Sequence, residues 1–193
     1  MRTRVVLTTA AAAALLSFSD VTVAAADDDH RRPQNIFTAG RMRPSNETPI
    51  CSATGTGSTR IEIAEDEQSL TFEVSYDLEG TVTVAHVHLG QAFVAGGVSF
   101  FFCGGGGKPA CDPSPATITG TVVPADILGP VGQGVAAGEF AEVVRAIRAG
   151  DAYSNVHSNI CPGGEVRGQL RHDPRRHGRR DGRAPGPRRA RRA

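Results

Sequence analysis

Residues 69–78 constrain the fold of this chain more than any other segment, because apolar and polar residues alternate through them without a break. Every even-numbered position from Leu70 onward is apolar, and every odd-numbered position between them is polar. Successive side chains of a β-strand point to opposite faces, so a period of two predicts a strand with one buried face. The chain is therefore expected to build a sheet around this strand.

Further strand-like segments are separated by Gly, Pro and Asn, and they cover residues 58–64, 81–89, 98–103, 116–123, 152–158 and 165–170. One helix is expected where Phe140, Val143, Val144 and Ile147 recur at helical spacing, with Gly150 placed as a C-terminal cap. Many short strands with turn signals between them are typical of a sandwich or barrel. The predicted fold is all-β, a Greek-key-like antiparallel sandwich or barrel of seven to eight strands with one short helix.

The N-terminal end has the layout of a secretory signal peptide. Arg2 and Arg4 precede an apolar run at residues 5–18, and small residues at 24–26 follow it. The run is shorter than the roughly 20 residues that a membrane-spanning helix needs. We predict a signal peptide at 1–26 that is cleaved near Ala26, a loose leader at 27–35 and a secreted or periplasmic protein.

The C-terminal end is rich in arginine. Residues 171–193 hold ten Arg and two Asp, and they lack Leu, Ile, Val and aromatic residues, so they cannot form a core. We predict a folded domain at 36–170 and a disordered tail after it. A weak contact of this tail with a polyanion is the functional alternative, and nucleic acid is not expected because no aromatic residues alternate with the arginines.

All four cysteines lie inside the predicted domain, and an exported chain meets an oxidising compartment, so we expect two disulfides. Four cysteines allow three pairings, and the sequence alone does not choose among them. Cys103 and Cys111 flank a glycine-rich loop and are the easiest pair to close, which leaves Cys51 for Cys161. A zinc site is the rival interpretation, although no CxxC spacing occurs.

Three parts of the chain resemble the CHRD (chordin-type) domain family. They read NETP at 46–49, AHVHLG at 85–90, and GDAYSNVH at 150–157 followed by PGGEVRGQL at 162–170. The resemblance implies a β-sandwich domain that occurs in animal chordin and in exported bacterial proteins. In chordin, the part of the protein around these domains takes part in growth-factor binding. For bacterial members the family implies no settled activity.

Six histidines occur, and His30, His172 and His177 fall outside the predicted domain. His86 and His88 lie two apart on one strand, so they share a face, and His157 comes from a distant strand. If these strands are neighbours, three imidazoles meet and form a site suited to copper or zinc.

Three nearby residues are candidates for the surroundings of this metal. Asn155 or Glu165 is expected to orient an imidazole from the second shell, and Arg167 is expected to attract an anion. The opposing interpretation is architectural, since buried histidines often bond to backbone or to neighbouring polar groups.

The arrangement also resembles part of the copper site of the copper/zinc superoxide dismutases, which place HxH on one strand and a later histidine on another. This chain lacks the further histidine that bridges copper to zinc and the cluster that binds zinc. The sequence favours an extracellular or periplasmic binding or structural module with a protein or polysaccharide partner, no membrane span and no predicted catalytic residue. A copper-binding protein that uses His86, His88 and His157 is the alternative.

Overall fold

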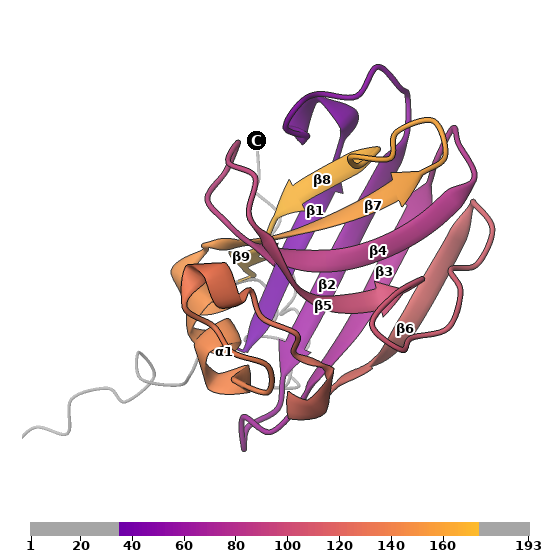
Figure 1. The fold of residues 1–193 in the computed structure, drawn as a ribbon. Helices are drawn as coiled ribbons and strands as arrows, with labels where there is room; N and C mark the ends of the chain where they lie inside the picture. The colour runs from indigo at the N-terminus through magenta and orange to yellow at the C-terminus, as the bar shows by residue number, and fades with distance from the viewer. Residues whose placement is uncertain (1–34, 174–193) are drawn as a thin grey trace, which may run out of the picture. The chain divides into compact units, whose positions relative to one another are not determined.

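A computed structural model describes residues 35–173 of the 193-residue chain. The predicted signal peptide and its cleavage point, the leader up to residue 34, and the tail from residue 174 lie outside the described residues. Within the described part, the chain forms two antiparallel sheets that face each other, with one α-helix beside them (Figure 1). The all-β prediction is confirmed.

The first sheet has five strands in the spatial order β6-β3-β2-β1-β9. They are β1 (Ile36–Met42), β2 (Thr56–Ile63), β3 (Leu70–Asp77), β6 (Ala116–Val122) and β9 (Arg171–His172). β3 is the strand with the period-two pattern, and its even-numbered side chains are buried while the odd-numbered ones are exposed or half-buried. The alternation therefore orients the sheet, because one face meets the core and the other meets solvent.

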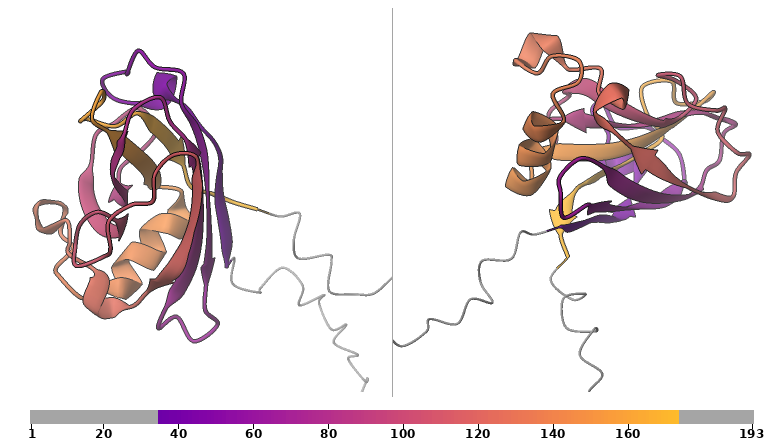
Figure 2. Two further views of the ribbon diagram at one scale, coloured as in Figure 1. Left: turned by 90° about the vertical axis from the view of Figure 1, so that its right-hand side faces the viewer. Right: turned by 90° about the horizontal axis from the view of Figure 1, so that it is seen from below.

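The second sheet has four strands in the order β5-β4-β7-β8. They are β4 (Val82–Leu89), β5 (Gly97–Cys103), β7 (Ala152–Ser158) and β8 (Val166–Gln169). A backbone bridge between Arg43 and Arg167 joins this sheet to the end of β1, so the two sheets are connected at one corner. The left view of Figure 2 shows the two layers edge on.

The core fills the space between the sheets, and its largest fully buried side chains include Phe37, Ile61 and Phe100. Helix α1 (Phe140–Ala149) closes one end of the sandwich (Figure 2). Its four buried residues are the four that the helical spacing singled out, and Gly150 caps it in the left-handed conformation at φ 79°. Three short 3-10 helices, Pro44–Asn46, Val131–Gln133 and Pro124–Asp126, lie in the connections.

Two disulfides tie loops to this frame. Cys51 pairs with Cys161 across 110 residues, and Cys103 pairs with Cys111 across a separation of 8. This is the pairing that loop length favoured. It also removes the zinc-cysteine alternative, because all four cysteines are used.

The folded part extends beyond the predicted boundary at Leu170. Arg171 and His172 form β9, which pairs with β1, and the Asp173 amide donates to the Ile36 carbonyl at 2.9 Å. The Arg171 guanidinium also donates to the Gly150 carbonyl at 3.1 Å. The composition of this segment gave no signal for a strand, because the pairing is made by backbone groups that every residue carries.

A chain that ends at Leu170 is therefore expected to be less stable than one that ends at Asp173. The three extra residues form several hydrogen bonds, each worth about 1 kcal/mol, and we expect a loss of about 1 to 3 kcal/mol in the free energy of unfolding. Urea unfolding of the two truncated proteins measures it. Equal midpoints for the two would show that β9 contributes nothing.

Candidate metal centre

The register of the four-stranded sheet places the candidate residues on one face. In β4 and β7, His86 lies opposite Asn155 and His88 lies opposite Tyr153. In β7 and β8, Asn155 lies opposite Arg167. Directly opposed residues of an antiparallel pair project from the same face, and so do residues two apart on a strand, which adds His157. The other face carries Ala85, Val87, Val156 and Val166, which are core residues.

Most of this polar face is withdrawn from solvent, with His88 half-buried, although it lies on the side away from the core. His86, Asn155 and Arg167 are 5%, 2% and 2% exposed, and His157 is 9% exposed. Segments between the strands cover it, and they are held there by hydrogen bonds from the face itself. Polar side chains that are withdrawn from water need partners, so the bonding of each histidine nitrogen becomes informative.

The three imidazoles meet at one place. One ring nitrogen from each of His86, His88 and His157 lies within 4.8 Å of the other two. The ring of His86 lies between the others, with centroid distances of 4.4 Å to His88 and 4.6 Å to His157. The rings could meet only if β4 and β7 are neighbours, and they are, while the metal site itself stays a prediction.

Two of the imidazoles have a defined tautomer. Nδ1 of His88 lies 2.8 Å from the Gly96 carbonyl oxygen, and Nδ1 of His157 lies 2.8 Å from the Pro162 carbonyl oxygen. A carbonyl oxygen only accepts, so each Nδ1 carries the hydrogen and each Nε2 carries a lone pair. Those two Nε2 atoms are buried without a hydrogen-bond partner, and so is Nδ1 of His86.

This set of nitrogens fits a transition-metal ion. The Nε2 lone pairs of His88 and His157 are unused, Nδ1 of His86 has no partner, and the carbonyl contacts on the remote nitrogens of His88 and His157 are the support that metal-binding histidines usually have. Three nitrogens bound at about 2.0 to 2.1 Å lie about 3.5 Å apart. One nitrogen from each ring already lies within 4.8 Å of the other two. Three imidazoles also leave a coordination position open for water or a small molecule.

Burial keeps the imidazoles neutral. Desolvation lowers the pKa of His86 from 6.5 to about 3, with help from the neighbouring His88 and His157. Desolvation likewise lowers the pKa of His88 to about 4 and lowers the pKa of His157. Neutral imidazole is the form that binds metal, so protons do not compete for these nitrogens at neutral pH.

Arg167 is packed against an aromatic ring. Its guanidinium carbon lies 3.4 Å from the centroid of the Tyr153 ring, and Tyr153 in turn stacks on His88 with centroids 4.7 Å apart and planes 8° from parallel. Its Nη2 donates to two loop carbonyls, those of Gln91 and Val94, at 2.9 Å each. The structure thus gives Arg167 a clamping contact, which the prediction of an anion-attracting residue did not include.

Asn155 and Glu165, the other two predicted second-shell residues, have different surroundings. Asn155 lies directly across from His86, and its side chain acts on the pKa values of His86 and His88. The carboxylate of Glu165 instead accepts hydrogen bonds from the amides of Glu79 and Gly80, at 2.7 and 3.2 Å. Glu165 therefore holds the turn between β3 and β4, and these contacts give it no part in orienting an imidazole.

Glu47 is the acidic group that we did not single out as a site residue. It is 5% exposed, and burial raises the pKa of its carboxyl from 4.5 to about 7 against the lowering effects of Arg167 and Asn155. Its Oε1 atom has no hydrogen-bond partner, and the carboxylate fills the space where a side chain at Gly164 would stand. The only sequence signal was its place in the NETP segment, because burial of a lone acid in a connection has no periodic pattern.

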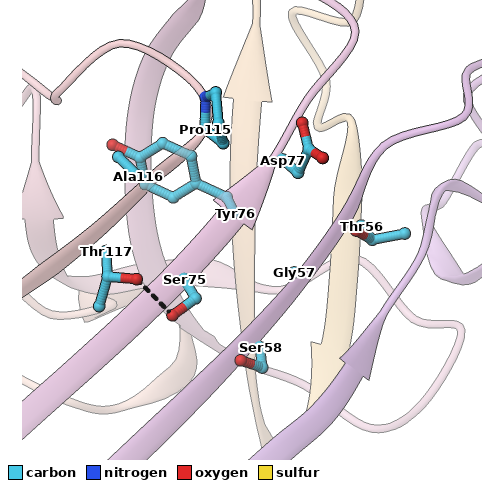
Figure 3. Close-up of a pocket in the computed structure, with 9 residues that line it drawn as sticks. All are labelled: Thr56, Gly57, Ser58, Ser75, Tyr76, Asp77, Pro115, Ala116 and Thr117. Carbon is cyan, nitrogen blue, oxygen red and sulfur yellow. Dashed lines mark hydrogen bonds between the residues drawn. The ribbon is translucent and has the colours of Figure 1, made fainter.

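A hollow of about 490 Å³ lies elsewhere, on the outer face of the five-stranded sheet (Figure 3). Strands β2, β3 and β6 supply its walls, and a hydrogen bond of 2.8 Å between Ser75 and Thr117 crosses it. Its lining includes Asp77 and Tyr76, and the Tyr76 hydroxyl is already bonded to the Asp112 carbonyl at 2.7 Å. This open hollow brings together no group of ligands comparable to the histidines.

A family model, the CHRD domain, matches residues 38–170. No curated protein and no solved structure matches the chain, so the partial resemblance to the dismutase copper site stays a prediction. Among residues 35–173, no helix is long and apolar enough to cross a membrane.

Proposed function

The chain belongs to the CHRD-domain family, and from that premise we propose that it is an extracellular or periplasmic binding module whose ligand is a transition-metal ion held by His86, His88 and His157. The match spans more than half of the chain and includes all three histidines. The family suggests a binding role outside the cytoplasm, and the two disulfides are compatible with such a location. The predicted signal peptide at 1–26 belongs to the same proposal.

The unused nitrogens carry this proposal. An architectural role would use the histidines to bond neighbouring groups, yet one nitrogen on each ring is buried and has no partner. Leaving a buried polar atom unsatisfied costs about 1 to 3 kcal/mol, and here one such atom occurs on each of three rings that bring a nitrogen within 4.8 Å of one another. A bound cation would satisfy all three at once.

Copper is the metal that this donor set favours. Three imidazoles without a thiolate suit copper or zinc, and for a given nitrogen site Cu²⁺ binds more tightly than Zn²⁺. Carboxylate-rich sites suit magnesium and calcium instead, and neither carboxylate near the cluster is a ligand of the set. We therefore expect Cu²⁺ to bind first, and Zn²⁺ to occupy the same site more weakly.

Titration of the purified mature protein with Cu²⁺ and with Zn²⁺ by calorimetry tests the proposal. One equivalent of Cu²⁺ should bind, and the double variant His86→Gln/His88→Gln should lose at least a hundredfold in affinity because two of three ligands are gone. The matched control is His172→Gln, which changes a histidine on β9, outside the cluster. Electron paramagnetic resonance spectra of bound Cu²⁺ should show couplings to nitrogen in the wild-type protein.

Copper bound equally well by the double variant would reject this site. If the wild-type protein binds no metal and the double variant is only less stable, the histidines are architectural. A protein or polysaccharide is then the partner to find.

A further inference from the structure

Two connecting loops supply the backbone carbonyls that fix the histidine tautomers. The Gly96 carbonyl accepts the hydrogen on Nδ1 of His88, and the Pro162 carbonyl accepts the hydrogen on Nδ1 of His157. The two tautomers of a neutral imidazole differ little in energy, so the bond made by the remote nitrogen decides which nitrogen faces the ion. Whatever holds these two carbonyls in place therefore controls the site.

The loop that ends at Gly96 is held by side chains of the polar face. The Arg167 guanidinium donates hydrogen bonds to the Gln91 and Val94 carbonyls. Gln169 donates to the Gly90 carbonyl at 2.8 Å, at the other end of the loop. The Gly96 amide donates to the Tyr153 hydroxyl at 3.1 Å, and the Gly97 amide, which shares a peptide unit with the Gly96 carbonyl, donates to Oε1 of Gln133 at 2.6 Å. Because the Arg167 guanidinium also lies over the Tyr153 ring, one side chain supports both the loop and the ring that stacks on His88.

The loop that carries Pro162 is held by a covalent bond. Cys161, the preceding residue, is joined to Cys51 in the segment after Glu47. The Cys161 amide donates to the Ser158 hydroxyl at 3.3 Å, and the Gly164 amide donates to the Cys161 carbonyl at 3.0 Å. The Glu47 carboxylate packs directly against Gly164. The disulfide thus fixes the loop between β7 and β8 next to the segment that brings Glu47 to the site.

We propose that Arg167 and the Cys51–Cys161 disulfide are separate positioning elements, of which the first fixes His88 through Gly96 and the second fixes His157 through Pro162. This inference rests on the proposed function for its consequence, which is tight metal binding. The tautomers themselves are properties of the metal-free protein. Their measurement therefore separates a failure of this inference from a failure of the metal proposal.

Nitrogen-15 NMR of the histidine rings in the metal-free protein at pH 8 is the direct test. In the wild-type protein, both His88 and His157 should carry the hydrogen on Nδ1. Arg167→Lys keeps the charge but loses the planar guanidinium, whose Nη2 bonds both loop carbonyls while its carbon lies over the Tyr153 ring, so His88 should become a mixture of tautomers while His157 is unchanged. Cys51→Ser/Cys161→Ser should do the reverse. Cys103→Ser/Cys111→Ser removes a disulfide that holds neither carbonyl, and it should leave both rings as they are.

Copper affinity should follow the tautomers. Each positioning variant should bind Cu²⁺ about 10- to 100-fold more weakly, the usual effect of losing an outer partner of a ligating histidine. Tautomer mixtures at both histidines in each variant would overturn the inference, because a general loosening of the fold does not select one histidine. Unchanged tautomers at both histidines in each variant would overturn it as well. Should the cysteine variant not fold, Arg167→Lys decides alone, since an unchanged His88 would reject the positioning role.

Discussion

Removing the Cys51–Cys161 disulfide is expected to lower the free energy of unfolding by about 5 kcal/mol, roughly twice the loss from removing Cys103–Cys111. A cross-link stabilises mainly by restricting the unfolded chain, and this effect grows with the loop that it closes. The separations of 110 and 8 residues correspond to about 5 and about 2.5 kcal/mol. A domain of this size has a total stability of about 5 to 15 kcal/mol, so losing the long-range bond brings it close to unfolding.

Urea unfolding of the two double variants, Cys51→Ala/Cys161→Ala and Cys103→Ala/Cys111→Ala, measures the difference at one temperature. The slope of the free energy against urea must also be compared, because releasing a long loop expands the unfolded chain and raises that slope. Equal losses for the two variants, or a larger loss for the short loop, would show that local packing rather than chain restriction governs the contribution of these bonds.

Lowering the pH from 7 to 4 is expected to destabilise the metal-free protein through its histidine cluster. The folded pKa values of His86 and His88, about 3 and about 4, lie below the ordinary histidine pKa of 6.5, which applies to the unfolded chain. Between those limits the unfolded chain binds more protons, so stability is full above pH 6.5 and falls as the pH drops toward the folded values. Each pKa unit is worth about 1.4 kcal/mol, which gives a loss on the order of 3 kcal/mol for each of these histidines at pH 4.

Glu47 opposes this trend. Its folded pKa of about 7 lies above the ordinary glutamate pKa of 4.5, so between these values the folded protein binds a proton that the unfolded chain does not. The stability gained from this proton is fully present below pH 4.5 and is lost as the pH rises through 7. The gain on acidification is on the order of 3 kcal/mol, about half of the combined loss from His86 and His88. The net effect is therefore a loss of stability in acid, smaller than the histidines alone would cause.

Urea unfolding between pH 4 and pH 7.5 separates the two contributions. His86→Gln/His88→Gln should flatten the decline, because its largest source is removed, whereas Glu47→Gln should make the decline steeper. Both are compared with the wild-type protein, so carboxylates common to all three cancel. If stability falls with decreasing pH in Glu47→Gln in parallel with the wild type, the Glu47 carboxyl has an ordinary pKa in the folded protein. If the fall of stability with decreasing pH is unchanged in His86→Gln/His88→Gln, the two histidines have ordinary pKa values.

Much of the fold was predictable from local patterns. The alternation in β3 and the spacing of Phe140, Val143, Val144 and Ile147 in α1 report directly which side chains face the core, because burial repeats with the period of the element. The boundaries of β7 were predicted to the residue. The two-residue strand β9 was missed, because its contacts are made by backbone groups and its arginine-rich sequence carries no apolar pattern.

The candidate site divides in the same way between sequence and structure. The sequence by itself determined that His86 and His88 share a face, because residues two apart on a strand must, and it supplied His157 as a candidate partner. Only the tertiary structure decided that β4 and β7 are neighbours in the register that brings the three rings together. It also decided that Glu165 serves a turn while Glu47 is buried beside Asn155 and Arg167. The physical reason is that side-chain identity sets local direction, whereas proximity between distant segments, and the backbone carbonyls of Gly96 and Pro162, depend on how the whole chain packs.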